Sequence, residues 1–392
     1  MKHLILFLII STLVPATIIQ AVEVDSWEHA MRTAADREVP ILLTIGISWS
    51  PQSQKFEQAL QEDPALKKFI DEQLVHFKVV AEHEPGAALA RKFGVENYPY
   101  FILLNSAGEL MDRWYGYGEC TIGRLQTICD DPVTLNQRLA RFRMHPTEED
   151  ARRLGELRHA EGLFAEAAAF YQRASELNPD SEVEYDMLIL TAMAYGNYYK
   201  LFSAGQLKAQ ADAILNGPRR TPEKLVKIAF AMGKLANREK DLSYFLPYLK
   251  TAVAETADID DPELQKLRRV LLPEYELYIT KNLDKALEYQ KQAQPEDWLE
   301  NAALMNNFAW WCFENKINLD EAEELARKAL KLAVPGRETA NISDTLAEIL
   351  ALKGDLKSAV KFSRKAVEAD PEYDYFQKQQ QKFESMLAKG KH

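Results

Sequence analysis

The feature that most constrains the fold is a pattern of small residues that recurs after residue 147. Two segments carry it, ARRLGELRHAEGLFAEAAAFYQRASELNPD at 151–180 and SDTLAEILALKGDLKSAVKFSRKAVEADP at 343–371. The matching positions are Leu154, Gly155, Gly162, Ala167, Tyr171, Ala174 and Pro179 in the first segment, and Leu346, Ala347, Gly354, Ala359, Ala366 and Pro371 in the second. Small residues at these points let two antiparallel helices cross closely. One such hairpin cannot bury its apolar face alone, so several must stack.

This pattern resembles the tetratricopeptide repeat (TPR), a helix pair of about 34 residues. Another copy spans 306–335, with about one extra residue in its turn, and a weaker copy spans roughly 270–298. Between them, GPRR at 217–220 and TADIDDPE at 256–263 break the period. We therefore expect TPR repeats at 147–180 and 270–390, with irregular or degenerate helical repeats at 181–269.

The resemblance implies a superhelix whose concave groove binds peptides or protein segments. Variable positions of the first helix in each pair line that groove. In this sequence they include Arg152, Glu156 and His159 in the first copy, Asn306, Trp310 and Phe313 in the third, and Asp344 and Glu348 in the last. Their mixed charges differ from a basic clamp for a C-terminal carboxylate, so the ligand stays open. A solvated face or ordinary helix packing is an equal alternative for each residue.

Residues 22–131 alternate strand-like and helix-like patterns. The predicted helices cover 27–35, 52–60, a segment after Asp63-Pro64, 86–95 and the region of CTIGRLQTIC; the predicted strands cover 40–48 and 74–82, and a hairpin over 100–117 turns at 106–108. This order predicts one small mixed sheet with helices on both faces.

Three landmarks in this segment resemble the thioredoxin family. Trp49-Ser50-Pro51-Gln52-Ser53 is similar to the family's W-C-x-x-C loop. The stretch Gly94–Pro99, which contains Tyr98-Pro99, is similar to the segment that ends in the family's cis-proline. The stretch Asn105–Gly108 is similar to the turn of the family's terminal hairpin. The chain is thus expected to be an α/β thioredoxin-like domain at 22–131, a helical linker at 132–146 and an all-α TPR-like solenoid.

The family's disulfide chemistry needs one thiolate that attacks and a second sulfur that resolves the mixed disulfide. Ser50 and Ser53 supply neither, and Thr44 stands where the family usually keeps a buried acid. We therefore interpret Trp49, Ser50 and Ser53 as a degenerate active-site loop with no catalytic residue. A hydrolytic role for Ser50 is disfavoured because no triad order is recognisable.

Peptide binding does not require sulfur. A cis-proline at Pro99 would hold the backbone of Tyr98 outward, where an extended peptide could pair with it, and Trp49 would border the groove. The alternative is that Trp49 and Pro99 are scaffold residues inherited with the fold.

The chain has three cysteines, and the nearest pair, Cys120 and Cys129, lies nine residues apart in a helix-like segment. That separation corresponds to about 13.5 Å of helix, too far for a disulfide. We predict free thiols, with Cys129 and Cys312 buried and Cys120 near a helix start.

Composition and net charge restrict the classes of partner that the chain could bind. A net charge of −11 with only short basic clusters argues against nucleic acid and anionic membranes. The histidines lack metal-ligand spacing, so we expect no metal and no cofactor. Residues 1–21 have the basic start, apolar run and small final residue of a signal peptide, although a retained anchor is the alternative.

The sequence thus favours an exported, periplasmic or secreted adaptor that binds protein or peptide partners, without stable membrane insertion and with its oligomeric state open. The alternative is a thiol-disulfide oxidoreductase or redox helper that acts through Cys120 or with a partner enzyme. A third possibility is that the N-terminal domain is only a spacer and the repeats do all the binding.

Overall fold

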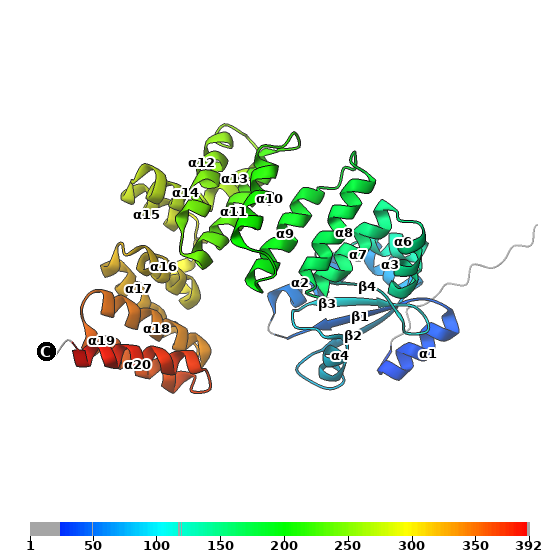
Figure 1. Ribbon diagram of the computed structural model, residues 1–392. Coiled ribbons are helices and arrows are strands. Elements are labelled where there is room, and N and C mark those ends of the chain that lie inside the picture. The colour runs from blue at the N-terminus through cyan, green and yellow to red at the C-terminus, as the bar shows by residue number, and fades with distance from the viewer. Residues whose placement is uncertain (1–23, 49, 117, 119, 390–392) are drawn as a thin grey trace, which may run out of the picture. The chain divides into compact units, whose positions relative to one another are not determined.

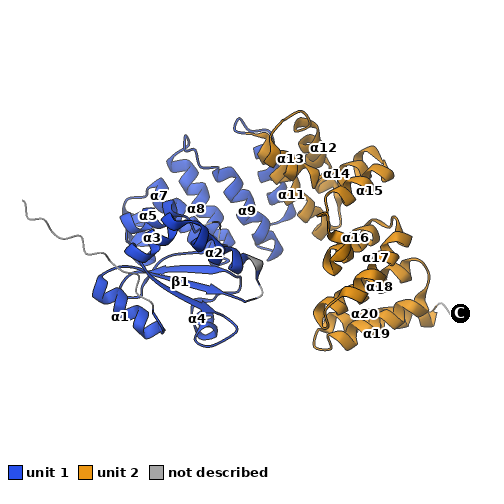
Figure 2. Cartoon of the chain, turned by 180° about the vertical axis from the view of Figure 1, so that it is seen from behind, with its two compact units in different colours: residues 1–219 blue, residues 220–392 orange. Residues whose placement is uncertain are grey.

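The computed structural model describes residues 24–48, 50–116, 118 and 120–389 (Figure 1). The predicted signal peptide at 1–21 and Trp49 lie outside the described residues. The chain divides into two compact units, residues 1–219 and 220–392 (Figure 2). The predicted linker at 132–146 and the first predicted repeat at 147–180 both fall inside the first unit.

The first unit begins with a four-stranded mixed sheet in the order β2-β1-β3-β4. Its strands are β1 (Ile41–Gly46), β2 (Val75–Val80), β3 (Tyr100–Leu104) and β4 (Leu110–Tyr115). β1 runs parallel to β2 and antiparallel to β3, and β3 and β4 form the predicted hairpin. The register shifts at Leu103/Leu104, where the hairpin pairing is irregular.

Helices cover both faces of this sheet, as predicted (Figure 1). They are α1 (Trp27–Arg37) and α4 (Gly86–Phe93) on one face, and α2 (Pro51–Glu62), α3 (Pro64–Gln73) and α5 (Ile122–Asp130) on the other. Because side chains alternate along a strand, Leu43 packs towards α1 and α4 while Leu42 packs towards α2 and α3. Phe56 of α2 meets Phe101 of β3 with ring centroids 4.7 Å apart.

Several helices begin directly after a residue whose side-chain oxygen caps the helix. Asp63 accepts hydrogen bonds from the backbone N–H groups of Ala65 and Leu66 at 3.0 Å, and Pro64 occupies the first helical position of α3. Thr121 caps α5 in the same way. These contacts satisfy backbone donors that the first turn of a helix leaves unpaired.

Helices make up the rest of the first unit. They are α6 (Leu135–Met144), α7 (Glu148–Ala160), α8 (Phe164–Leu177), α9 (Tyr185–Tyr198) and α10 (Ala204–Leu215). The helix pair predicted over 147–180 forms as α7 and α8. A Cβ atom at Gly155 would lie 2.6 Å from the ring of Tyr171, which explains why a glycine stands at this crossing.

The second unit is helical throughout its described residues. Its first part contains α11 (Pro222–Glu239), η2 (Leu242–Tyr244), α12 (Leu246–Glu255), α13 (Pro262–Arg269), α14 (Leu272–Tyr275), η3 (Glu276–Thr280), α15 (Leu283–Gln292) and η4 (Trp298–Glu300). The short α14 and the π-helical η3 show that this region is irregular, in the stretch where the sequence period weakens.

Regular hairpins close the chain. They are formed by α16 (Ala302–Asn315), α17 (Leu319–Leu332), α18 (Arg337–Leu352) and α19 (Leu356–Ala369), with α20 (Asp374–Lys389) packed on α19. Phe308, Ala322, Leu346 and Ala359 are fully buried in one common core. Cys312 lies in this core, as the sequence predicted.

Buried charges join the sheet to the first helical hairpin. Asp112 of β4 is 3% exposed, and Arg124 of α5 contacts its Oδ2 at 3.1 Å. Arg124 also lies 3.5 Å from Glu156 of α7, and Arg153 of α7 lies 3.3 Å from Glu156 and 3.8 Å from Asp112. The α/β domain and α7 therefore share one ion network.

A second polar contact reinforces this junction. The Tyr100 hydroxyl of β3 donates to the carbonyl oxygen of Ala160, the last residue of α7, at 2.9 Å. Arg113 Nε donates to the same hydroxyl at 2.7 Å. The helical hairpin thus contacts β3 and β4 as well as α5.

We expect Arg124→Ala to lower the free energy of unfolding by about 3 kcal/mol, because it leaves Asp112 buried without its nearest cation. Lys67→Ala is the matched control, since Lys67 pairs with Asp71 at the surface and should contribute less than about 1 kcal/mol. Urea unfolding of both variants measures the difference. Equal, small effects would contradict the importance of the buried network.

Candidate functional site

The loop between β1 and α2 is held by its two serine hydroxyls. Ser50 Oγ accepts a hydrogen bond from the Ser53 N–H at 3.3 Å and caps α2. Ser53 Oγ accepts from the Ile47 N–H, also at 3.3 Å. Ser50 is 7% exposed. Both hydroxyls therefore serve the local fold rather than facing a base.

A cavity of about 190 Å³ lies beside this loop, and Ser53, Gln54, Thr44 and Pro99 help to line it. The Tyr98–Pro99 peptide bond is cis, as the resemblance implies. The Pro99 carbonyl accepts from the Gly116 N–H at 3.0 Å, and Tyr98 is half-buried. Ser53 and Pro99 thus line one cavity, and the predicted border residue Trp49 lies outside the described residues.

Thr44, which stands where the family usually keeps a buried acid, makes an uncharged hydrogen bond in this chain. Thr44 Oγ1 lies 3.0 Å from Nε2 of His76 on β2. Burial lowers the pKa of His76 to about 4, although nearby Glu57 opposes the shift, so the imidazole is uncharged at neutral pH. The pair completes a buried hydrogen bond. Sequence reasoning missed His76 because only the pairing of β1 with β2 places it opposite Thr44.

The three cysteines are free thiols in apolar surroundings. Cys120 is 5% exposed in the core against α5, and burial raises its thiol pKa to about 12. Burial also raises the pKa of Cys312 to about 12 and that of the half-buried Cys129 to about 11. Cys129 is thus less buried than predicted. Cys120 lies just before α5, near a helix start as predicted, and its side chain turns into the core.

In the first repeat, the predicted groove residues contact their own neighbours. Arg152 pairs with Glu149 and Glu156, with N–O distances of 2.5 and 2.6 Å. His159 packs edge-on against Phe164, with ring centroids 5.2 Å apart, and burial lowers its pKa. These charges are already partnered within the first unit.

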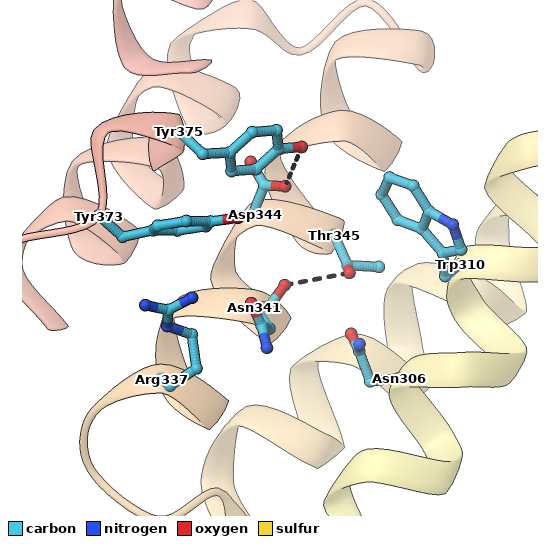
Figure 3. A pocket seen from close by; sticks show the side chains of 8 residues that line it. All are labelled: Asn306, Trp310, Arg337, Asn341, Asp344, Thr345, Tyr373 and Tyr375. Atoms are coloured by element: carbon cyan, nitrogen blue, oxygen red, sulfur yellow. Dashed lines mark hydrogen bonds between the residues drawn. The ribbon is translucent and has the colours of Figure 1, made fainter. Parts of the chain in front are cut away.

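In the last repeats, three predicted residues meet at one cavity of about 300 Å³ (Figure 3). Asn306 and Trp310 come from α16, and Asp344 comes from α18. The remaining lining residues are Arg337, Asn341, Thr345, Tyr373 and Tyr375. Arg337, Asn341 and Thr345 follow the four-residue spacing of one helix face, a signal that the sequence offered. The two tyrosines were not predictable from that spacing, because they lie before and at the start of α20.

The other two predicted residues lie elsewhere. Phe313 helps to line a larger cavity of about 990 Å³, together with Phe230 and Trp311. Glu348 accepts a hydrogen bond from Gln379 Nε2 at 2.7 Å and pairs with Lys382 of α20. The structure therefore brings together Asn306, Trp310 and Asp344, but not the whole predicted set.

Within the described residues, no three His, Cys, Asp or Glu side chains gather in a way that could hold a metal ion. The same part of the chain contains no helix that is both long and apolar enough to cross a membrane.

Comparison with known families identifies two parts of the chain. The profile of a thioredoxin-like domain matches residues 27–121, and that of a tetratricopeptide repeat matches residues 341–373. The chain therefore has an α/β thioredoxin-like domain followed by a TPR-like helical region. Comparison with curated proteins finds no match.

Solved structures resemble parts of the chain at low identity. A tetratricopeptide repeat protein from Parabacteroides merdae is 14% identical, with 67% of this chain and 96% of that chain covered and a TM-score of 0.42. The DsbH oxidoreductase is 16% identical over 29% of this chain and 88% of its own, with a TM-score of 0.25. The Cut9–Hcn1 hetero-tetramer matches at 14% identity over 63% of this chain and 44% of that chain, with a TM-score of 0.39.

We expect the native protein to react slowly with a thiol reagent such as 5,5′-dithiobis(2-nitrobenzoate). A thiol pKa of about 12 leaves fewer than about one Cys120 in 10,000 ionised at pH 7.5, and thiolate is the reacting species. All three cysteines should react promptly once the chain is unfolded in guanidinium chloride. Rapid stoichiometric labelling of native Cys120 would contradict its burial.

Proposed function

We propose that this chain is an exported, non-catalytic adaptor whose thioredoxin-like domain does not exchange disulfides and whose TPR-like repeats bind protein or peptide partners. The presence of both a thioredoxin-like domain and a TPR repeat supports a protein-interaction role in general. The proposed export rests on the signal-peptide pattern of residues 1–21, which implies a periplasmic or secreted location.

The proposal that the domain is redox-inactive rests on the hydrogen bonds made by Ser50 and Ser53. Their hydroxyls accept backbone hydrogen bonds within the loop, at the positions where the family's sulfurs would react. A serine hydroxyl is a far weaker acid than a thiol, and a helix N-terminus contributes only about 1 kcal/mol to ionisation. The loop can therefore contact a partner without forming a mixed disulfide.

The competing proposal, redox chemistry through Cys120, finds little support in that residue's surroundings. A reactive cysteine needs exposure and a lowered pKa, whereas Cys120 is buried and its pKa is raised. A redox helper that acts only by binding a separate oxidoreductase is compatible with the adaptor role, because its own thiols would not react.

An insulin-reduction assay with dithiothreitol tests this proposal. We expect the wild-type protein and Cys120→Ser to match the background rate. The double substitution Ser50→Cys/Ser53→Cys is the positive comparison: it restores both sulfurs at the start of α2, and we expect a rate at least about tenfold above background.

Turnover by the wild-type chain that disappears in Cys120→Ser would contradict the proposal and establish the oxidoreductase alternative. The whole chain should be used, because removing 22–131 would also take away Asp112 and Arg124, which contact Arg153 and Glu156 of α7.

A further inference from the structure

The cavity between α16, α18 and the start of α20 has an acidic wall (Figure 3). Asp344 lines it and is only 5% exposed. The Tyr375 hydroxyl donates to Asp344 Oδ2 at 3.1 Å, but Asp344 Oδ1 has no hydrogen-bond partner among the described residues. A buried carboxylate with half of its accepting capacity unused is energetically unfavourable in the free protein.

A second acceptor in the same cavity is also unused. Asn306 Oδ1 is buried and has no hydrogen-bond partner among the described residues. It comes from α16, whereas Asp344 comes from α18, so two helices bring unsatisfied oxygen atoms to one cavity. Oxygen acceptors without donors fit a ligand that carries N–H groups.

The surrounding charges leave Asp344 without a counter-ion. Glu348, one turn further along α18, pairs with Lys382 of α20. Arg337 pairs with Asp370, and its guanidinium carbon lies 3.9 Å from the ring centroid of Tyr373. The one cation lining the cavity is therefore already engaged, and no described residue forms an ion pair with Asp344.

Burial raises the pKa of Asp344 to about 6. Glu348 adds to this shift, whereas hydrogen bonding by Tyr375 and Gln379 and the charge of Lys382 oppose it. The carboxylate is consequently still charged at pH 7 to 8, at a cost in stability. The pKa of Asp344 in the folded protein lies above its value in the unfolded chain, so protonated Asp344 favours folding at low pH. This contribution to the free energy of unfolding is lost as the pH rises from about 4 to about 6, and it stays lost at higher pH.

Aromatic rings form the rest of the wall. Tyr373 and Tyr375 are 43% and 40% exposed, with ring centroids 5.8 Å apart, and Trp310 faces them across the cavity in Figure 3. Electron-rich ring faces attract cations, with tryptophan the strongest. Arg337 over Tyr373 shows the same kind of contact inside the protein.

We propose that this cavity binds a cationic group, the ammonium of lysine or the guanidinium of arginine, presented by a partner peptide. The cation supplies the missing counter-charge for Asp344, its N–H groups face Asn306, and its stem packs against Trp310. This inference rests on the proposed peptide-binding function and names the chemistry of one contact.

Three alanine- and serine-rich heptapeptides with blocked ends test the proposed cation site. They are identical except for the central residue, which is lysine, arginine or Nε-acetyl-lysine. Binding is followed by titration calorimetry and through the Trp310 indole N–H in an NMR spectrum, assigned with Trp310→Phe. We expect the lysine and arginine peptides to bind at least about tenfold more tightly than the acetyl-lysine peptide and to shift the Trp310 signal.

Asp344→Asn should abolish this preference. It should also raise the melting temperature at pH 7.5 by about 2 °C or more, since it removes the buried charge. Loss of binding in a more stable variant cannot come from unfolding. Asp284→Asn, which removes an exposed charge on α15, is the matched control and should keep the preference.

Equal, measurable binding of the lysine and acetyl-lysine peptides would overturn the cation site while leaving peptide capture by the repeats intact. A cation preference that persists in Asp344→Asn would overturn it too. Tighter binding of a glutamate peptide, lost in Arg337→Gln, would assign the cavity to an anion and contradict the inference.

Discussion

The fold of the first unit depends on the ion network around Asp112. This carboxylate is buried on the edge strand β4, and removing a buried charge from water is unfavourable unless cations compensate it. One cation, Arg124, comes from the thioredoxin-like domain, and the other, Arg153, comes from the first helical hairpin. Within the thioredoxin-like domain, Asp112 accepts hydrogen bonds from Arg124 and from the Arg113 backbone N–H. Arg153 of the hairpin adds a second cation 3.8 Å from this carboxylate. The hairpin is therefore part of the same folded body, and the idea of a separable spacer domain loses physical support.

The same principle of satisfying buried polar groups explains the degenerate loop. Replacing sulfur by hydroxyl at Ser50 and Ser53 gives hydrogen bonds that a thiol makes only weakly, and the loop uses them to cap α2 and to hold Ile47. Thr44, which lines the cavity beside the loop, forms a similar neutral pair with His76. The cis Tyr98–Pro99 bond is present, and Pro99 lines the same cavity as Ser53 and Thr44.

The sequence predicted the elements of the α/β domain well because strands such as Ile41–Gly46 are short apolar runs and helices such as Pro64–Gln73 carry their own caps. It also selected Asn306, Trp310 and Asp344, since groove positions recur with the repeat. The sequence could not show that Glu156 forms an ion pair with Arg124, because these residues belong to segments that are distant along the chain. Tyr373 and Tyr375 were missed for the same reason: their role depends on how the last helix packs.

The most direct test asks whether partner capture needs sulfur or the acidic cavity. Crosslinking and affinity capture, carried out in the compartment where the protein is found, should compare the wild-type chain, a cysteine-free chain (Cys120→Ala, Cys129→Ser and Cys312→Ala) and Asp344→Asn. The account predicts that the cysteine-free chain retains the wild-type partner and that Asp344→Asn captures it less efficiently. Loss of the partner in the cysteine-free chain, or a mixed disulfide seen on a non-reducing gel, would contradict it.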